Sequence, residues 1–276
     1  MQRRIQLLAA AAAFALSTIA TAAVAQAPAT RKPDLSGFWG GPNVGGSQGA
    51  GFDLIFPSRR CAPTQFECDA RTNQSIDGEF TDRYDSPSRP LYKPEFWDRV
   101  QYLDMNTNKE DPLFKCQSYG IPRVGPPSRI IQMDKEVLIF YRAGAGAGTQ
   151  PADYRTIWMD QPHDPVRAID VTFYGDSVGK WEGDTLVIDT VGFNDETWLD
   201  KGGFFTSDQK RVIERLRREG DTLIYDVTVE DPGVLVEPWV MDTKRVPLNK
   251  DPKAFIPESP PCHDYDLENM VNQIRH

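Results

Sequence analysis

The stretch from residue 194 to residue 200 brings an amide, three carboxylates and an indole together, directly after a predicted strand. The polar side chains are those of Asn194, Asp195, Glu196 and Asp200, and Trp198 stands between them. At the mouth of a barrel, such groups would bind the oxygens of a small molecule while the indole stacks on its ring. The stretch could instead be a surface loop whose Trp198 covers one end of the fold.

Glu214 is notable because strand alternation directs it towards the interior. Val212, Glu214 and Leu216 share one face of the predicted strand. A buried carboxylate must be paired, hydrogen-bonded or protonated, so Glu214 is a candidate acid or base. Asp200 is a second candidate, and Arg155 is the expected partner of an oxyanion or carboxylate. Glu214 could instead form a purely structural ion pair with an arginine.

His163 is the only one of the three histidines that is well placed for catalysis. It lies between Asp160 and Asp164, so a carboxylate could orient it as a general base; it could equally cap a turn. The sequence has no Cys/His cluster with zinc spacing, and the acidic residues of 194–200 lack a calcium-loop spacing. We therefore expect neither a metal nor a cofactor.

The elements that must position these residues are predicted strands. From residue 129 onward, alternating runs turn at residues 133–135, 182–184 and 219–221, and the last two hairpins share the sequences WEGDTLVIDT and REGDTLIYDV. Such a meander must close on itself or pack against a second sheet. With Gly37-x-Trp39 opening a first strand, we expect a mainly β fold: an antiparallel meander that closes into a lipocalin-like barrel with long irregular arms. The alternative is a β-sandwich. Residues 96–105 are predicted to form a short helical turn.

The chain begins with a predicted signal peptide. Arg3 and Arg4 precede an Ala/Leu/Phe run, and Ala23-Val24-Ala25 fits a cleavage site. We expect a periplasmic or secreted protein without a membrane span, because no later stretch approaches about 20 apolar residues. Removing residues 1–25 would change the formal net charge from −9 to −11, since two arginines are lost. This charge disfavours nucleic acid and anionic lipid, and leaves a small molecule as the expected partner.

The chain divides into four predicted parts. Residues 1–25 are the signal peptide, 26–110 the first strand and an irregular arm, 111–245 the β-barrel core, and 246–276 a C-terminal tail tied to the core. The four cysteines of an exported chain favour two disulfides, for which three pairings are possible. We predict Cys61–Cys68 within the arm and Cys116–Cys262 between the core and the tail.

Several stretches together resemble a family of exported, mostly uncharacterised bacterial proteins. They are DPLFKCQSYGIPR, YRTIWMD, SVGKWEGDTLVIDTVGFNDETWLDKGG, ERLRREGDTLIYDVTVEDP and EPWV, spread in order over residues 111–240. The resemblance marks Arg123, Arg155, Asp160, Trp181, Asn194, Asp195, Trp198, Asp200, Ser207, Glu214, Asp231 and Trp239. The chain departs from the family pattern at Arg142, where a carboxylate is usual, and at Thr206-Ser207, where the pattern has His-Ser. The resemblance implies no particular reaction.

We expect an exported small-molecule enzyme, a cofactor-independent lyase or isomerase that uses acid–base chemistry on a partly hydrophobic substrate in a barrel pocket. The candidate catalytic residues are Glu214, Asp200, His163 and Arg155. The candidate substrate-binding residues are Asn194, Trp198, Tyr154, Asp195 and Trp181. We expect Asn194, Trp198 and Asp200 to face the cavity into which Glu214 points. The alternatives are a non-catalytic periplasmic carrier for a small hydrophobic ligand and a cell-envelope interaction protein that uses its acidic arms, such as residues 57–95.

Overall fold

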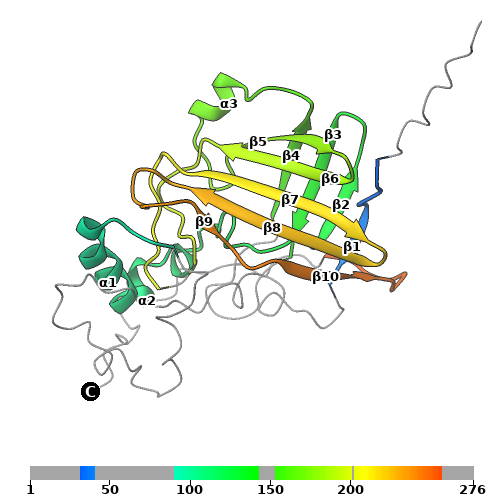
Figure 1. The fold of residues 1–276 in the computed structure, drawn as a ribbon. Helices are drawn as coiled ribbons and strands as arrows, with labels where there is room; N and C mark the ends of the chain where they lie inside the picture. The colour runs from blue at the N-terminus through cyan, green and yellow to red at the C-terminus, as the bar shows by residue number, and fades with distance from the viewer. Residues whose placement is uncertain (1–31, 41–89, 143–152, 201, 257–276) are drawn as a thin grey trace, which may run out of the picture. The chain divides into compact units, whose positions relative to one another are not determined.

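The computed structural model describes residues 32–40, 90–142, 153–200 and 202–256 (Figure 1). The predicted signal peptide, Cys61, Cys68, Cys262 and most of the arm at 57–95 lie outside these ranges. Within them, no helix is both long and apolar enough to cross a membrane. Cys116 is disulfide-bonded, but the other cysteines lie outside the described residues, so both predicted pairings stay predictions.

The described strands form one sheet, and every strand except β9 belongs to a closed ring. The sheet order is β10-β1-β2-β3-β4-β5-β6-β7-β8-β9, and β10 also pairs with β8 (Figure 1). The bounds are β1 (Gly37–Trp39), β2 (Arg129–Gln132), β3 (Glu136–Tyr141), β4 (Asp153–Met159), β5 (Asp176–Glu182), β6 (Thr185–Val191), β7 (Arg211–Glu219), β8 (Thr222–Glu230), β9 (Trp239–Val240) and β10 (Lys244–Asn249). The predicted mainly β barrel is confirmed, and the sandwich alternative is wrong because hydrogen bonds run round the whole ring.

Strand β10 closes the barrel between β8 and β1. Lys244 lies opposite Tyr225 of β8, and Leu248 lies opposite Trp39 of β1. The Trp39 indole donates to the Leu35 carbonyl over 3.0 Å. The guanidinium of Arg218, near the end of β7, lies over the indole ring, with its Cζ 5.6 Å from the ring centroid. The Gly-x-Trp motif thus packs its buried indole at one end of β7, and β10 extends the barrel beyond the predicted range 111–245.

One strand pair departs from the expected antiparallel meander. β4 and β5 are parallel, with Ile157 opposite Ser177, whereas the other ladders of the ring are antiparallel. A parallel pair requires the chain to cross back before the second strand begins. Residues 160–175 make this crossing and contain the short helix α3 (Pro165–Ile169), which is seen beside β5 in Figure 1. β5 therefore begins only at Asp176, after this crossing.

The two similar hairpins turn as their sequences predict. Glu182 pairs with Thr185 and Glu219 pairs with Thr222, so each loop has two residues. The first loop residues, Gly183 and Gly220, have φ of 64° and 60°. Glycine suits this position because it adopts positive φ without a steric penalty.

Replacing Gly183 or Gly220 by Val is expected to lower the free energy of unfolding by about 1 kcal/mol or more. A Cβ at either position would meet no atom within 4 Å, so the cost comes only from forcing a β-branched residue to positive φ. Asn tolerates this conformation, so the matched Gly→Asn variants should lose less. Urea denaturation checks both pairs; equal stability of the Val and Asn variants would contradict the turn assignment.

The described helices before the barrel are short. The 3₁₀ turn η3 (Pro94–Phe96) leads into α1 (Trp97–Met105), in agreement with the predicted helical turn, and α2 (Thr107–Glu110) and the 3₁₀ turn η4 (Pro112–Lys115) follow. Tyr92 anchors this region: its ring centroid lies 5.6 Å from that of Trp97 and 5.3 Å from that of Phe205. The α1 region therefore packs against the segment that follows β6.

Candidate active site

An arginine and a glutamate meet inside the barrel. Arg155 of β4 and Glu214 of β7 form an ion pair in which their side chains are 3% and 0% exposed. Arg155 Nη2 donates to Glu214 Oε2, and the Tyr225 hydroxyl of β8 donates to Oε1 over 2.8 Å. Val212 and Leu216 flank Glu214 and are fully buried. The inward direction that alternation predicts for Glu214 is therefore correct.

Further polar groups complete this buried set. Arg155 Nε donates to the Tyr141 hydroxyl over 2.8 Å, and Nη1 donates to Ser177 Oγ over 3.2 Å and to Thr190 Oγ1 over 3.4 Å. Ser177 Oγ and Thr190 Oγ1 lie 3.0 Å apart. We call these six residues the interior cluster: Tyr141, Arg155, Ser177, Thr190, Glu214 and Tyr225.

The two tyrosines of the interior cluster stay protonated at neutral pH. Burial, and then the charge of Glu214, raise the pKa of Tyr225 well above its usual value. Burial is also the main reason that the pKa of Tyr141 is raised. Tyr225 is therefore a permanent donor to Glu214. The cluster holds one cation, one carboxylate and neutral hydroxyl donors, which is a set that can bind an oxygen-rich group and move a proton.

A second polar group surrounds Arg123, near the end of the barrel opposite Trp39. The Arg123 guanidinium donates both of its terminal NH₂ groups to Asp111, with both distances at 2.7 Å. Its Cζ lies 4.9 Å from the Tyr119 ring centroid and 5.9 Å from that of Trp198. Asp200 is buried nearby. Burial alone would lower the pKa of Arg123, but the charge and hydrogen bonds of Asp111, and after them the charge of Asp200, raise this pKa above its usual value. Trp198 and Asp200 thus lie with Arg123, whereas the hydrogen bonds found for Glu214 run to Arg155 and Tyr225.

Lys210 is a buried charge-bearing residue that the sequence reasoning missed. Its side chain is among the largest that are fully buried. Lys210 Nζ donates to Thr197 Oγ1 over 2.6 Å and approaches the Ile121 carbonyl at 3.4 Å. Burial lowers the pKa of Lys210 to about 7, and the charge of Asp231 offsets part of this effect. Lys210 lies one residue before β7 and an even number of residues from Glu214. Extending the strand alternation by one step would therefore have predicted that Lys210 also points inwards.

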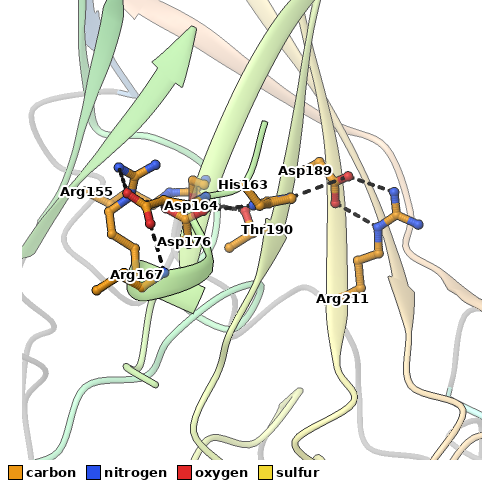
Figure 2. A network of polar contacts seen from close by, with 10 residues as sticks. Arg155, His163, Asp164, Arg167, Asp176, Asp189, Thr190 and Arg211 are labelled. Carbon is orange, nitrogen blue, oxygen red and sulfur yellow. Dashed lines mark hydrogen bonds and ion pairs between the residues drawn. The ribbon is translucent and has the colours of Figure 1, made fainter. Parts of the chain in front are cut away.

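His163 lies in a network on the outer face of the barrel (Figure 2). Its Nδ1 is 2.9 Å from Asp176 Oδ2, and its Nε2 is 3.7 Å from Asp189 Oδ2. Asp176 and Asp189 precede the inward-facing Ser177 and Thr190, so strand alternation turns them outwards. His163 therefore belongs to a different site from Glu214.

The carboxylate that orients His163 is Asp176, not a sequence neighbour. Asp160 pairs with Lys32 at 3.8 Å, and Asp164 caps α3 by accepting from the Val166 amide over 2.8 Å. Figure 2 shows arginines at both sides of the network. Arg167 donates to Asp176 over 2.6 Å, and Arg211 donates to Asp189 over 2.7 Å. The network thus ties the 160–175 crossing to β5, β6 and β7.

Replacing Asp176 by Asn is expected to lower the free energy of unfolding at pH 7 by about 1–3 kcal/mol, because Arg167 and His163 lose their shared anion. Burial raises the pKa of Asp176, but hydrogen bonds from Arg167 and His163 outweigh burial and hold this pKa below its usual value. The ionised form therefore adds stability above the usual pKa of 3.8, and this contribution is lost as the pH falls through the lowered folded-state pKa. Urea titrations at pH 7 and at progressively lower pH should show the difference between wild type and variant shrinking; a constant difference would contradict the assignment.

The other predicted binding residues are scattered. Tyr154 is 64% exposed on the barrel wall and stacks on Phe140, with 5.8 Å between ring centroids. Trp181 is half-buried against the core, and Asp195 is exposed. Asn194 is half-buried, and its Oδ1 accepts no hydrogen bond within the described part of the chain. The structure brings none of these four residues into contact with the interior cluster through a hydrogen bond or ion pair among the described residues.

The described residues hold no group of three or more His, Cys, Asp and Glu side chains arranged to bind a metal ion.

No protein-family model, curated protein or solved structure matches the chain. Fold and site together define a closed mixed β-barrel with an ionic, hydrogen-bonded interior. The resemblance to the exported bacterial family rests on the sequence motifs alone.

Proposed function

We propose that this protein is an exported, cofactor-independent enzyme, a lyase or isomerase that transfers a proton on a small, partly hydrophobic molecule inside the barrel. The observation that carries the proposal is the Arg155–Glu214–Tyr225 set. A buried ion pair adds little net stability, because its desolvation offsets the attraction of the charges, and apolar side chains of similar volume would often serve as well. An ion pair buried inside the barrel is thus better explained by chemistry than by folding.

The three groups suit complementary roles. Arg155 would bind a carboxylate or carbonyl oxygen and stabilise the negative charge that develops there. Glu214 would take a proton from the adjacent carbon. It would then return that proton to another carbon in an isomerisation, or to the leaving group in an elimination. Tyr225, which remains protonated, would hold the carboxylate of Glu214 in place through its 2.8 Å hydrogen bond.

Turnover of a small-molecule extract from the host, in the presence of EDTA, tests the proposal. Glu214→Gln should abolish turnover. Gln leaves Arg155 without its counter-ion, so a near-UV circular dichroism spectrum must show that the variant is folded. Arg215→Gln is the matched control, because Arg215 lies on the solvent face of the same strand and pairs with Glu182 at 3.0 Å. Full turnover by a folded Glu214→Gln variant would contradict the proposal.

A second candidate function is that of a non-catalytic carrier for a small ligand. This function is favoured because both carboxylate oxygens of Glu214 already accept a hydrogen bond, one from Arg155 and the other from Tyr225. A bound molecule would therefore have to compete with Arg155 and Tyr225 for these oxygens. The carrier would be favoured over the enzyme if a compound from the same extract bound saturably and was recovered unchanged. Arg155→Met should then lose this binding.

A further inference from the structure

Lys210 places a primary amine at the end of the barrel that lies away from Trp39. Arg218, which covers Trp39, and Lys210 stand at opposite ends of β7. Two segments meet at Nζ: Thr197 and Phe193 come from the chain after β6, and Ile121 comes from the chain before β2. Nζ lies 4.1 Å from the Phe193 ring centroid. The amine is thus enclosed by a hydroxyl, a carbonyl and an aromatic face.

This enclosure contains no carboxylate partner. Within the described residues no carboxylate oxygen lies within 4.0 Å of Lys210 Nζ, although Asp231 is close enough for its charge to act on the amine. An enclosed ammonium without a counter-ion is unfavourable, so the neutral amine is populated near pH 7. Thr206 Oγ1 lies 3.4 Å from Thr197 Oγ1, so a second hydroxyl stands beside the one that contacts Nζ.

We propose that Lys210 is a nucleophilic amine that forms an imine with a small aldehyde or ketone at this end of the barrel. The neutral nitrogen adds to the carbonyl carbon to give a carbinolamine. Loss of water from that adduct gives the carbon–nitrogen double bond, with Thr197 placed to relay the protons. Phe193 gives the site an apolar wall, which suits a carbonyl compound with a short hydrocarbon chain. Lys210 is fully buried, so the carbonyl compound would have to displace the segment around Thr197 to reach Nζ.

Reductive trapping tests the proposal with a defined probe. The folded protein is treated with propanal and sodium cyanoborohydride at pH 7 for short times, digested, and analysed by mass spectrometry for propylated lysines. Lys180 and Lys250, with side chains 64% and 70% exposed, are internal controls. An ordinary lysine is neutral in only about 1 molecule in 2,500 at pH 7, so Lys210 is expected to react at least tenfold faster than both controls.

Two further measurements make the result decisive. The advantage of Lys210 should shrink as the pH rises towards 10 and should vanish in urea, where the burial of Nζ is lost. Lys210→Met should remove the fast-reacting peptide, whereas Lys180→Met should retain it. If Lys210 in the folded wild type reacts no faster than Lys180 and Lys250, or remains unmodified while they react, the proposal is wrong. The wild-type peptide map decides this even if Lys210→Met does not fold, and it is independent of whether Glu214 transfers protons.

Discussion

Replacing Glu214 by Leu is expected to lower the free energy of unfolding by about 3–5 kcal/mol. The variant leaves the Arg155 guanidinium buried without its anion, and an uncompensated charge in a barrel interior is strongly destabilising. Arg155→Met should cost a similar amount, because it leaves Glu214 unpaired. The double variant, Arg155→Met with Glu214→Leu, should return to within about 1 kcal/mol of the wild type, since neither charge then needs a partner.

Urea denaturation of the four proteins measures this coupling directly. The exposed pair between Arg215 and Glu182 provides a matched comparison on the same strand, and its coupling energy should be far smaller than that of the interior pair. If the losses of the two interior single variants simply added in the double variant, the buried ion pair would be contradicted.

Lys210→Met is expected to stabilise the protein at neutral pH, by on the order of 4 kcal/mol. Burial lowers the pKa of Lys210 from 10.5 to about 7, and each pKa unit corresponds to roughly 1.4 kcal/mol. The loss of the hydrogen bond to Thr197 offsets part of the gain. This is an unusual direction for a core substitution, because most of them destabilise.

The pH dependence of this gain has a definite sign. The pKa of Lys210 is lower in the folded state than in the unfolded state, so below about pH 7 the folded protein bears the full cost of burying the ammonium. Between about pH 7 and 10.5 the unfolded state binds more protons, and the wild-type stability rises relative to Lys210→Met. The two stabilities should therefore converge at high pH. Lys180→Met, at an exposed site, should match the wild type throughout; a pH-independent difference for Lys210→Met would contradict the buried amine.

The barrel was largely predictable because its strands obey local rules. Period-two alternation placed Val212, Glu214 and Leu216 inside, and the Gly-Asp loops at 183 and 220 fixed the two hairpins. The parallel pairing of β4 with β5 was not predictable in this way, since the crossing between them contains only a five-residue helix. Closure by β10 was also missed, because Pro247 interrupts its alternation and its partners lie far away in the sequence.

The candidate site was predictable only one residue at a time. Alternation identified Glu214. Its partners Arg155 and Tyr225 lie 59 and 11 residues away in the sequence, so these contacts depend on the strand register. The partner of His163 was missed for the same reason, because Asp176 begins the strand after the crossing. Trp198 and Asp200 are buried, as residues of a pocket wall would be, but they lie beside Arg123. No local sequence pattern reveals that Arg123 pairs with Asp111.

Solvent deuterium incorporation is the most direct test of the proposed proton transfer inside the barrel. The wild type, treated with EDTA in D₂O, should place deuterium on carbon in a compound of the host extract, or release a product formed by elimination. Tyr225→Phe keeps the ion pair between Arg155 and Glu214 but removes the hydroxyl that holds Oε1, so it should slow this exchange at least tenfold while Arg215→Gln leaves it unchanged. Exchange at the wild-type rate in both Tyr225→Phe and a folded Glu214→Gln would contradict the assignment of the interior cluster as the site of catalysis.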